Sequence, residues 1–191
     1  MRNIDIALFV NPEILYGDRI MLRKMSKNDL DDVYEYASDP KVSEFLLWSP
    51  HPSKDFTGKY LRYIERKYKK GEFYDWAIEY GGKMIGICGF TALSVENQGG
   101  EIGFVLNSSY WGLGIAREAA SLVIKYGFEV LNLERIEARY MADNLQSRRV
   151  MEKCGMSYEG TYRKSFFVKG KYRDISVFSI LKEEYYELKN K

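Results

Sequence analysis

The amino-acid sequence predicts an α+β domain, in which helices connect some strands of one mixed sheet and tight turns connect the others. Two observations indicate this fold class. Apolar and polar residues alternate through the middle of the chain, over residues 76–107, whereas helical spacing of apolar residues dominates before and directly after it. Glycine pairs at 81–82 and 99–100 interrupt the alternation, as they do at the turns of an antiparallel meander.

The first part of the chain predicts a short strand and two helices. The strand is expected around residues 20–22, and helical spacing follows over 30–37 until Pro40 ends it. Ser53 is a suitable N-cap for the second helix, and Gly71 is a suitable end. Its other faces are rich in lysine and arginine, which is typical of a solvated face and also compatible with a basic patch for RNA or an acidic protein. The apolar stripe expected on this helix consists of Phe56, Tyr60, Ile64 and Tyr68.

The remaining elements follow from the same two periods. A helix is expected from Ile115, with a strand after it over residues 135–141. Asn144 opens a short helix that ends at Gly155, and two final strands flank a turn at 169–171. The three strands of the meander are expected over residues 76–80, 83–92 and 101–107.

The composition is that of one compact domain. The chain has 191 residues, 46% of them hydrophobic, and no linker-like or repeated segment, so we expect a single domain over residues 1–191. The formal net charge of +2 gives no strong field for a polyanion, and no apolar run reaches the ~18–20 residues of a membrane helix. Because the first residues also lack a signal-peptide pattern, we expect a cytoplasmic protein that binds neither membranes nor, directly, nucleic acids.

Metal-binding residue types are scarce. Cys88 and Cys154 are far apart, match no metal spacing and are expected in the core. The single histidine, His51, excludes a histidine-rich metal site. We therefore expect a protein that uses no metal.

The segment over residues 110–116, with Gly112 and Gly114, is the most informative part of the sequence. Glycines between a strand and a helix let main-chain N–H groups converge, and the helix N-terminus adds its positive dipole, so the loop is suited to hold a phosphate-bearing ligand. A tight turn without a ligand explains the two glycines as well. The dinucleotide-binding fingerprint fails because Arg117 stands at its third glycine, and a Walker A loop fails because Met84 follows Gly82-Lys83.

A second motif begins at Asn144 and reads Asn-x-x-Ser-x-x-Val-x-Glu-Lys-x-Gly-Met over residues 144–156. Together with Gly114 and Ala116 of the loop, and in this order, it resembles the GNAT superfamily of acetyl-coenzyme A-dependent N-acetyltransferases. Within that superfamily the chain is similar to the RimJ/RimL-type ribosomal-protein N-terminal acetyltransferases. The loop departs from the superfamily pattern Gln/Arg-x-x-Gly-x-Gly/Ala at its first position, which is Trp111.

The resemblance implies a fold and a binding mode for acetyl-coenzyme A. The fold is a mostly antiparallel sheet of about seven strands with about four helices, splayed between the fourth and fifth strands. The pantetheine arm is expected between the splayed strands, held by Asn144, and the pyrophosphate over residues 111–117. Without the resemblance, Asn144 is also explained as an ordinary N-cap. The resemblance assigns these residues to acetyl-coenzyme A: Phe104, Val105, Leu106, Trp111, Gly112, Leu113, Gly114, Ile115, Ala116, Arg117, Asn144 and Ser147.

Amine attack on a thioester needs a neutral amine and a proton for the leaving thiolate. Glu101 is the candidate general base, and a strand-end surface carboxylate is its alternative interpretation. The resemblance gives the acid role to Ser147, because Met151 stands where many family members have a tyrosine; Tyr140 is a weaker substitute.

The sequence indicates less about the acceptor amine than about the acetyl donor. The loop over residues 45–51 resembles one that lines the acceptor end in this subfamily, which makes Trp48 and His51 candidate substrate contacts; packing on the sheet as a loop anchor is the alternative. The resemblance implies a protein N-terminal α-amine as acceptor and is compatible with a homodimer. Acetylation of a small amine such as a polyamine or aminoglycoside, a non-catalytic acyl-coenzyme A-binding module and a basic RNA-binding domain are the other hypotheses.

Overall fold

A computed structural model describes residues 9–190 of the chain, and its centre is one eight-stranded sheet with the order β1-β2-β3-β4-β5-β6-β8-β7. All neighbouring strands are antiparallel except β5 and β6, which are parallel. The predicted α+β class is therefore confirmed. The strands are β1 (Leu15–Tyr16), β2 (Ile20–Arg23), β3 (Asp75–Tyr80), β4 (Lys83–Ser94), β5 (Gly99–Leu106), β6 (Arg135–Met141), β7 (Ser157–Val168) and β8 (Lys171–Leu181).

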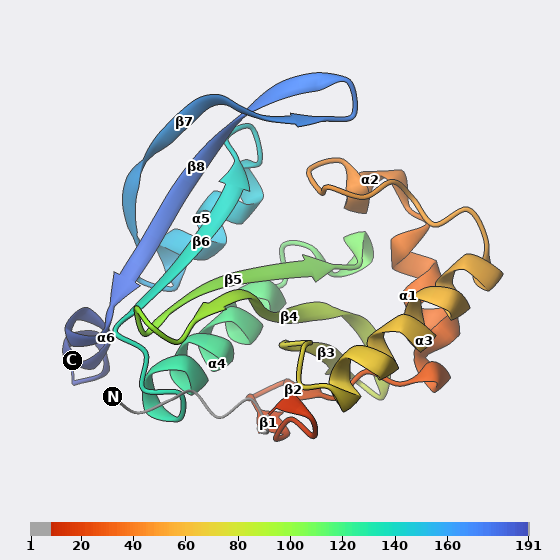
Figure 1. Ribbon diagram of the computed structural model, residues 1–191, viewed down its shortest axis with the longest axis horizontal. Helices are drawn as coiled ribbons and strands as arrows, with labels where there is room; N and C mark the ends of the chain where they lie inside the picture. The colour runs from red at the N-terminus through yellow and green to blue at the C-terminus, as the bar shows by residue number, and fades with distance from the viewer. Residues whose placement is uncertain (1–8, 191) are drawn as a thin grey trace.

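Helices cover both faces of the strands β2 to β5 (Figure 1). One face packs on α4 and forms the larger core around Trp76, Ile102 and Val123; the other packs on α1 and α3 and forms a second core around Ala77, Val33 and Ile64. Trp76 and Ala77 are adjacent in β3, so the alternation read from the sequence sends neighbouring side chains into different cores. The α-helices in the described residues are α1 (Leu30–Ala37), α2 (Pro40–Ser43), α3 (Lys54–Lys69), α4 (Ile115–Glu129), α5 (Leu145–Lys153) and α6 (Lys182–Lys189).

The predicted caps determine where two of these helices start. Ser53 accepts a hydrogen bond from the main-chain N–H of Phe56 at 3.2 Å, which opens α3. Asn144 accepts one from the N–H of Ser147 at 3.2 Å, which opens α5, and Gly155 follows its end with a positive φ of 79°.

The parallel pair β5 and β6 is joined over only part of its length. The ladder runs from Gly99 and Arg135 to Ile102 and Ala138, and beyond that point no residue of β5 pairs with β6. Figure 1 shows β6, β7 and β8 turning away from β5 there. The predicted splay is thus confirmed between the strand before the glycine loop and the strand before Asn144, which the structure numbers fifth and sixth because β1 precedes them.

Besides two short 3-10 helices, one strand and two α-helices were not predicted from the sequence: β1, α2 and α6. β1 and α2 are too short to show a period, and α6 is a mainly polar segment with no buried residue. The apolar stripe of α3 was also partly wrong, since Thr57 and Leu61 are buried beside Ile64 and Tyr68, whereas Phe56 is 46% exposed. The buried face of the helix includes Thr57, whose hydroxyl contacts the ring of His51 at 2.9 Å.

Candidate active site

Two pockets open where β5 and β6 separate. The one we call the wide pocket encloses about 780 Å³ above the faces of β3, β4 and β5, and the one we call the loop pocket encloses about 630 Å³ between the glycine loop and α5. Because they share part of their walls, a molecule in one can contact a molecule in the other. The shared residues are Phe45, Leu46, Phe104, Val105, Asn144 and Ser147.

The separation of the strands leaves main-chain groups available at this junction. Residues 103–106 of β5 remain hydrogen-bonded to β4 on one side but face no strand on the other. An extended chain with amide groups, such as a pantetheine arm, satisfies the open side as a further strand would.

The glycine loop has the geometry of an anion site. Gly112 and Gly114 both have a φ of +80°, a conformation that side-chain-bearing residues rarely adopt, and α4 begins at Ile115 directly after them. An added Cβ at Gly112 would meet no atom within 4 Å, so the wall of the loop pocket is open there. Trp111, at the divergent motif position, donates its indole N–H to the carbonyl of Leu106 at 2.9 Å and fixes the loop to the end of β5.

The structure brings together all the predicted coenzyme-binding residues except one. Only Leu113 does not line the loop pocket; its side chain is 52% exposed and its carbonyl accepts a hydrogen bond from Arg19 at 2.8 Å. Sequence reasoning missed Lys41, Arg149 and Lys153, which add positive charge to the wall that also holds Arg117. Arg149 and Lys153 lie one turn apart on α5, and this spacing was the available signal.

Asn144 is an N-cap, as its alternative interpretation held, and it also lines both pockets. Its carbonyl oxygen is used by the cap, whereas its amide nitrogen has no hydrogen-bond partner within residues 9–190. The two interpretations are therefore compatible, since the amide group still has donors to offer a ligand. Ser147 lies in the first turn of the same helix, and Tyr140 and Met151 line the wide pocket.

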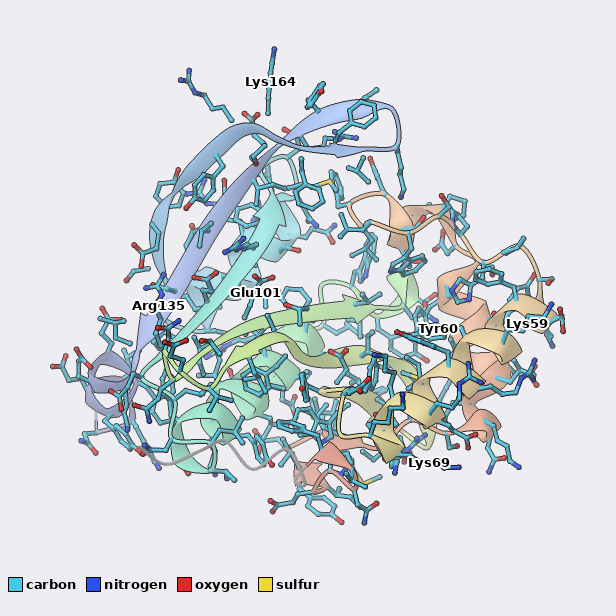
Figure 2. The ribbon with its side chains drawn as sticks, in the orientation of Figure 1. Lys59, Tyr60, Lys69, Glu101, Arg135 and Lys164 are labelled. Carbon is cyan, nitrogen blue, oxygen red and sulfur yellow. The ribbon has the colours of Figure 1, made fainter. Side chains whose placement is uncertain are left out.

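Glu101 lies in the wide pocket, between β5 and β6 in Figure 2. One carboxylate oxygen accepts a hydrogen bond from the hydroxyl of Thr91 at 3.0 Å, and the other is 3.2 Å from the Nε of Arg139. Arg139 also pairs with Glu137 at 2.8 Å. The predicted base is thus in the pocket, but both of its oxygens are engaged.

A second carboxylate in the wide pocket, Asp75, was not found from the sequence. It is the first residue of β3, and burial raises its pKa from 3.8 to about 7. A carboxyl with a pKa near neutrality in a pocket is a typical sign of a functional group. A lone aspartate before a strand carries no such signal in the sequence.

Trp48 lines the wide pocket, but His51 does not. His51 is 9% exposed and lies among the rings of Trp48, Phe56 and Tyr60, with Nδ1 at 2.9 Å from the hydroxyl of Thr57. Burial lowers its pKa, which favours the neutral ring. Of the two candidate substrate contacts, only Trp48 faces the pocket, whereas His51 packs inside the loop, as the alternative interpretation of a loop anchor has it.

No group of three or more His, Cys, Asp or Glu side chains within residues 9–190 is arranged to hold a metal ion. Cys88 is fully buried and Cys154 partly so, and both are free thiols. Within the same residues, no helix combines the length and the apolar character that crossing a membrane requires.

Residues 19–157 match the family described as the acetyltransferase (GNAT) domain. An uncharacterized N-acetyltransferase of Bacillus licheniformis, p20, is 35% identical over 175 residues, which cover 91% of this chain and 98% of that protein.

One further relative and one protein of similar structure act on different acceptors. Spermidine N(1)-acetyltransferase of Escherichia coli (strain K12) is 25% identical over 167 residues, or 87% of this chain and 88% of that protein. The solved structure of RimL, a ribosomal α-N-protein acetyltransferase in complex with coenzyme A, superposes with a TM-score of 0.77 at 21% identity over 88% of this chain and 98% of that one. At 21% identity, the similarity to RimL shows only that the two chains share a fold.

Proposed function

Since the chain belongs to the GNAT family of acetyl-coenzyme A-dependent N-acetyltransferases, we propose that it acetylates the α-amine at the N-terminus of a polypeptide, as the RimJ/RimL-type enzymes do. The observation that carries the proposal is the junction of the two pockets at Phe104, Asn144 and Ser147. A thioester held from the loop pocket and an amine held in the wide pocket meet only there.

The loop pocket is suited to the donor. The positive-φ glycines, the start of α4 and the basic side chains Arg117, Arg149 and Lys153 suit the phosphates, while the open edge of β5 and the Asn144 amide suit the pantetheine arm. Bound acetyl-coenzyme A supplies an acetyl group activated as a thioester. The open main-chain N–H groups of residues 103–106 are suited to stabilise negative charge on its carbonyl oxygen.

The wide pocket is suited to a substrate in which the amine is attached to an apolar group. Its walls combine aromatic and aliphatic side chains, among them Phe45, Trp48 and Phe166, with the two carboxylates Asp75 and Glu101. Apolar walls accommodate the first side chain of a polypeptide, and the carboxylates attract its ammonium group. Ser147, which lines both pockets, is the proposed proton donor to the leaving thiolate.

A small polyamine is the second candidate acceptor. The presence of two carboxylates in one pocket favours it, because a polyamine carries a positive charge for each of them. An apolar wall contributes little to such a ligand, and for this reason we rank the peptide α-amine first.

The choice is tested by measuring kcat/KM for thiol release with acetyl-coenzyme A and three acceptor sets: short peptides with free N-termini, the same peptides with blocked N-termini, and polyamines or aminoglycosides. We expect the free peptides to be the best substrates and blocking to abolish turnover. A higher kcat/KM with spermidine than with any free peptide overturns the acceptor assignment. Coenzyme binding without turnover of any amine makes the protein a binding module instead.

A further inference from the structure

Asp75 is the free carboxylate of the wide pocket. Its main chain is held in place, since the carbonyl accepts a hydrogen bond from the hydroxyl of Tyr68 at 2.7 Å and the residue pairs with Gly89 of β4. Its carboxyl group, by contrast, has no hydrogen-bond or ion-pair partner within residues 9–190. Asp75 is partly buried and lines the wide pocket, so a molecule in that pocket can reach its carboxyl group and supply the missing partner.

Two glycines share a row of the sheet with Asp75. Gly89 stands opposite Asp75, and Gly103 of β5 stands opposite Gly89. A Cβ added to Gly89 would lie 2.3 Å from the Cα of Asp75 and 2.7 Å from its Oδ1, so Asp75 packs closely against this glycine. With strands ~4.8 Å apart, the row from Asp75 to Gly103 spans ~10 Å.

This row ends at the junction of the two pockets. Gly103 precedes Phe104, which lines both the wide pocket and the loop pocket. An amine that lies over Gly89 and Gly103 is therefore close to the Asp75 carboxyl on one side and to the junction on the other.

The surroundings of Asp75 favour an exchangeable proton. Its neighbours on α1, α3 and β4 are hydroxyl and thiol groups that are neutral at pH 7, and burial raises their pKa values further. The charged groups that share the pocket are Glu101 and Arg139, which pair with each other. With a pKa of about 7, Asp75 is close to an α-amine at ~8, so a proton moves between them at little cost. The neutral neighbours are Tyr36, Tyr60, Tyr68 and Cys88.

Building on the proposed function, we propose that Asp75, rather than Glu101, accepts the proton of the acceptor's ammonium group. One N–H bond of the ammonium breaks and an O–H bond forms on Asp75, which leaves a neutral amine. The nitrogen then bonds to the acetyl carbon while the C–S bond breaks. After this bond has formed, the nitrogen carries one proton more than the amide product. That proton ends on the sulfur of coenzyme A, and Asp75 returns its proton to water.

Glu101 is the less suitable acceptor because both of its oxygens are already bonded. Taking a proton would cost it the contact with Arg139 or the hydrogen bond from Thr91. Glu101 lines the same pocket. In this scheme it is a positioning residue that acts through the electrostatic field of its pair with Arg139.

The test compares Asp75→Asn and Glu101→Gln with the wild type by pH profiles of kcat and kcat/KM, using the best acceptor of the panel above. We expect Asp75→Asn to lower kcat at pH 7 by about 10²-fold or more, with the deficit shrinking as the pH rises and the amine becomes neutral by itself. An acceptor whose amine is already neutral at pH 7 should restore most of the rate. The KM for acetyl-coenzyme A should stay unchanged, because Asp75 does not line the loop pocket.

Asp18→Asn is the matched control, since Asp18 is exposed and outside both pockets. If the wild type turns over and the rate of Asp75→Asn is within twofold of the wild-type rate, the Asp75 inference is overturned. The proposed function is then left intact. A raised acceptor KM at unchanged kcat, or a pH-dependent loss in Glu101→Gln alone, also overturns it. Absence of thiol release in the wild type with every acceptor is instead a failure of the proposed function. Thermal unfolding of each variant verifies that it is folded.

Discussion

Asp75 should lower the stability of the folded protein at neutral pH, and replacing it with asparagine should raise that stability. In the unfolded chain an aspartate titrates near 3.8, whereas in the fold burial raises its pKa to about 7. The folded state therefore disfavours the charged form. The cost is absent below about pH 4, grows as the pH rises, and reaches its full size above the folded pKa of about 7.

The size of the effect follows from the two pKa values. At 1.36 kcal/mol for each pH unit between 3.8 and about 7, the full cost is at most about 4 kcal/mol, and water in the open pocket reduces it. Urea unfolding at pH 5 and pH 8 measures it as the difference in the free energy of unfolding between Asp75→Asn and the wild type. We expect the variant to be more stable at pH 8, and its advantage at pH 5 to be less than half as large.

Two results would refute this reasoning. A variant that is less stable than the wild type at pH 8 would mean that the carboxylate has a partner that stabilises its charge. An advantage that does not change between pH 5 and pH 8 would mean that the gain has no connection with ionisation. The exposed Asp18→Asn should show neither a gain nor a pH dependence.

Three further outcomes test the rest of the account. Gly114→Val should abolish coenzyme binding measured by calorimetry, whereas Gly82→Val, which has a similar φ of 79° in the turn between β3 and β4, should suffer the same backbone strain and bind normally. Acetyl-coenzyme A at 100 times its Kd should stabilise the fold by about 2.7 kcal/mol, and an unchanged melting temperature would exclude the binding mode. Asp29→Ala should lower the free energy of unfolding in urea by about 1–3 kcal/mol, because it removes the 2.7 Å partner of Arg23, which keeps Glu79, and the capping contact of Ser26; an unchanged free energy of unfolding would contradict this.

The donor half of the site was predictable because its geometry is local. Gly114 and Asn144 each act through the turn in which they stand, and the start of a helix after a strand is visible as a change of period. Asn144 and Ser147 are within one helical turn, so their proximity needs no knowledge of the tertiary fold. The GNAT fold and the splay beside β5 followed from these motifs.

The acceptor half depends on which strands lie opposite each other, and that information is not local. Asp75 lines the wide pocket from β3, and its row neighbours Gly89 and Gly103 come from two other strands. Similarly, His51 contacts Thr57 on the next helix and does not line the pocket. Sequence periodicity cannot reveal either contact, because it reports on one segment at a time, whereas each contact depends on how two or more segments pack together.

The central claim is that an acetyl group passes from the loop pocket to an amine in the wide pocket at their shared wall. A single-turnover experiment with acetyl-labelled coenzyme A and a free N-terminal peptide tests it most directly, with the label followed by mass spectrometry. We expect one acetyl group on the peptide α-amine for each thiol released, and no label transferred by Gly114→Val. Thiol released without acetylated amine, or label transferred equally well by Gly114→Val, would contradict the claim.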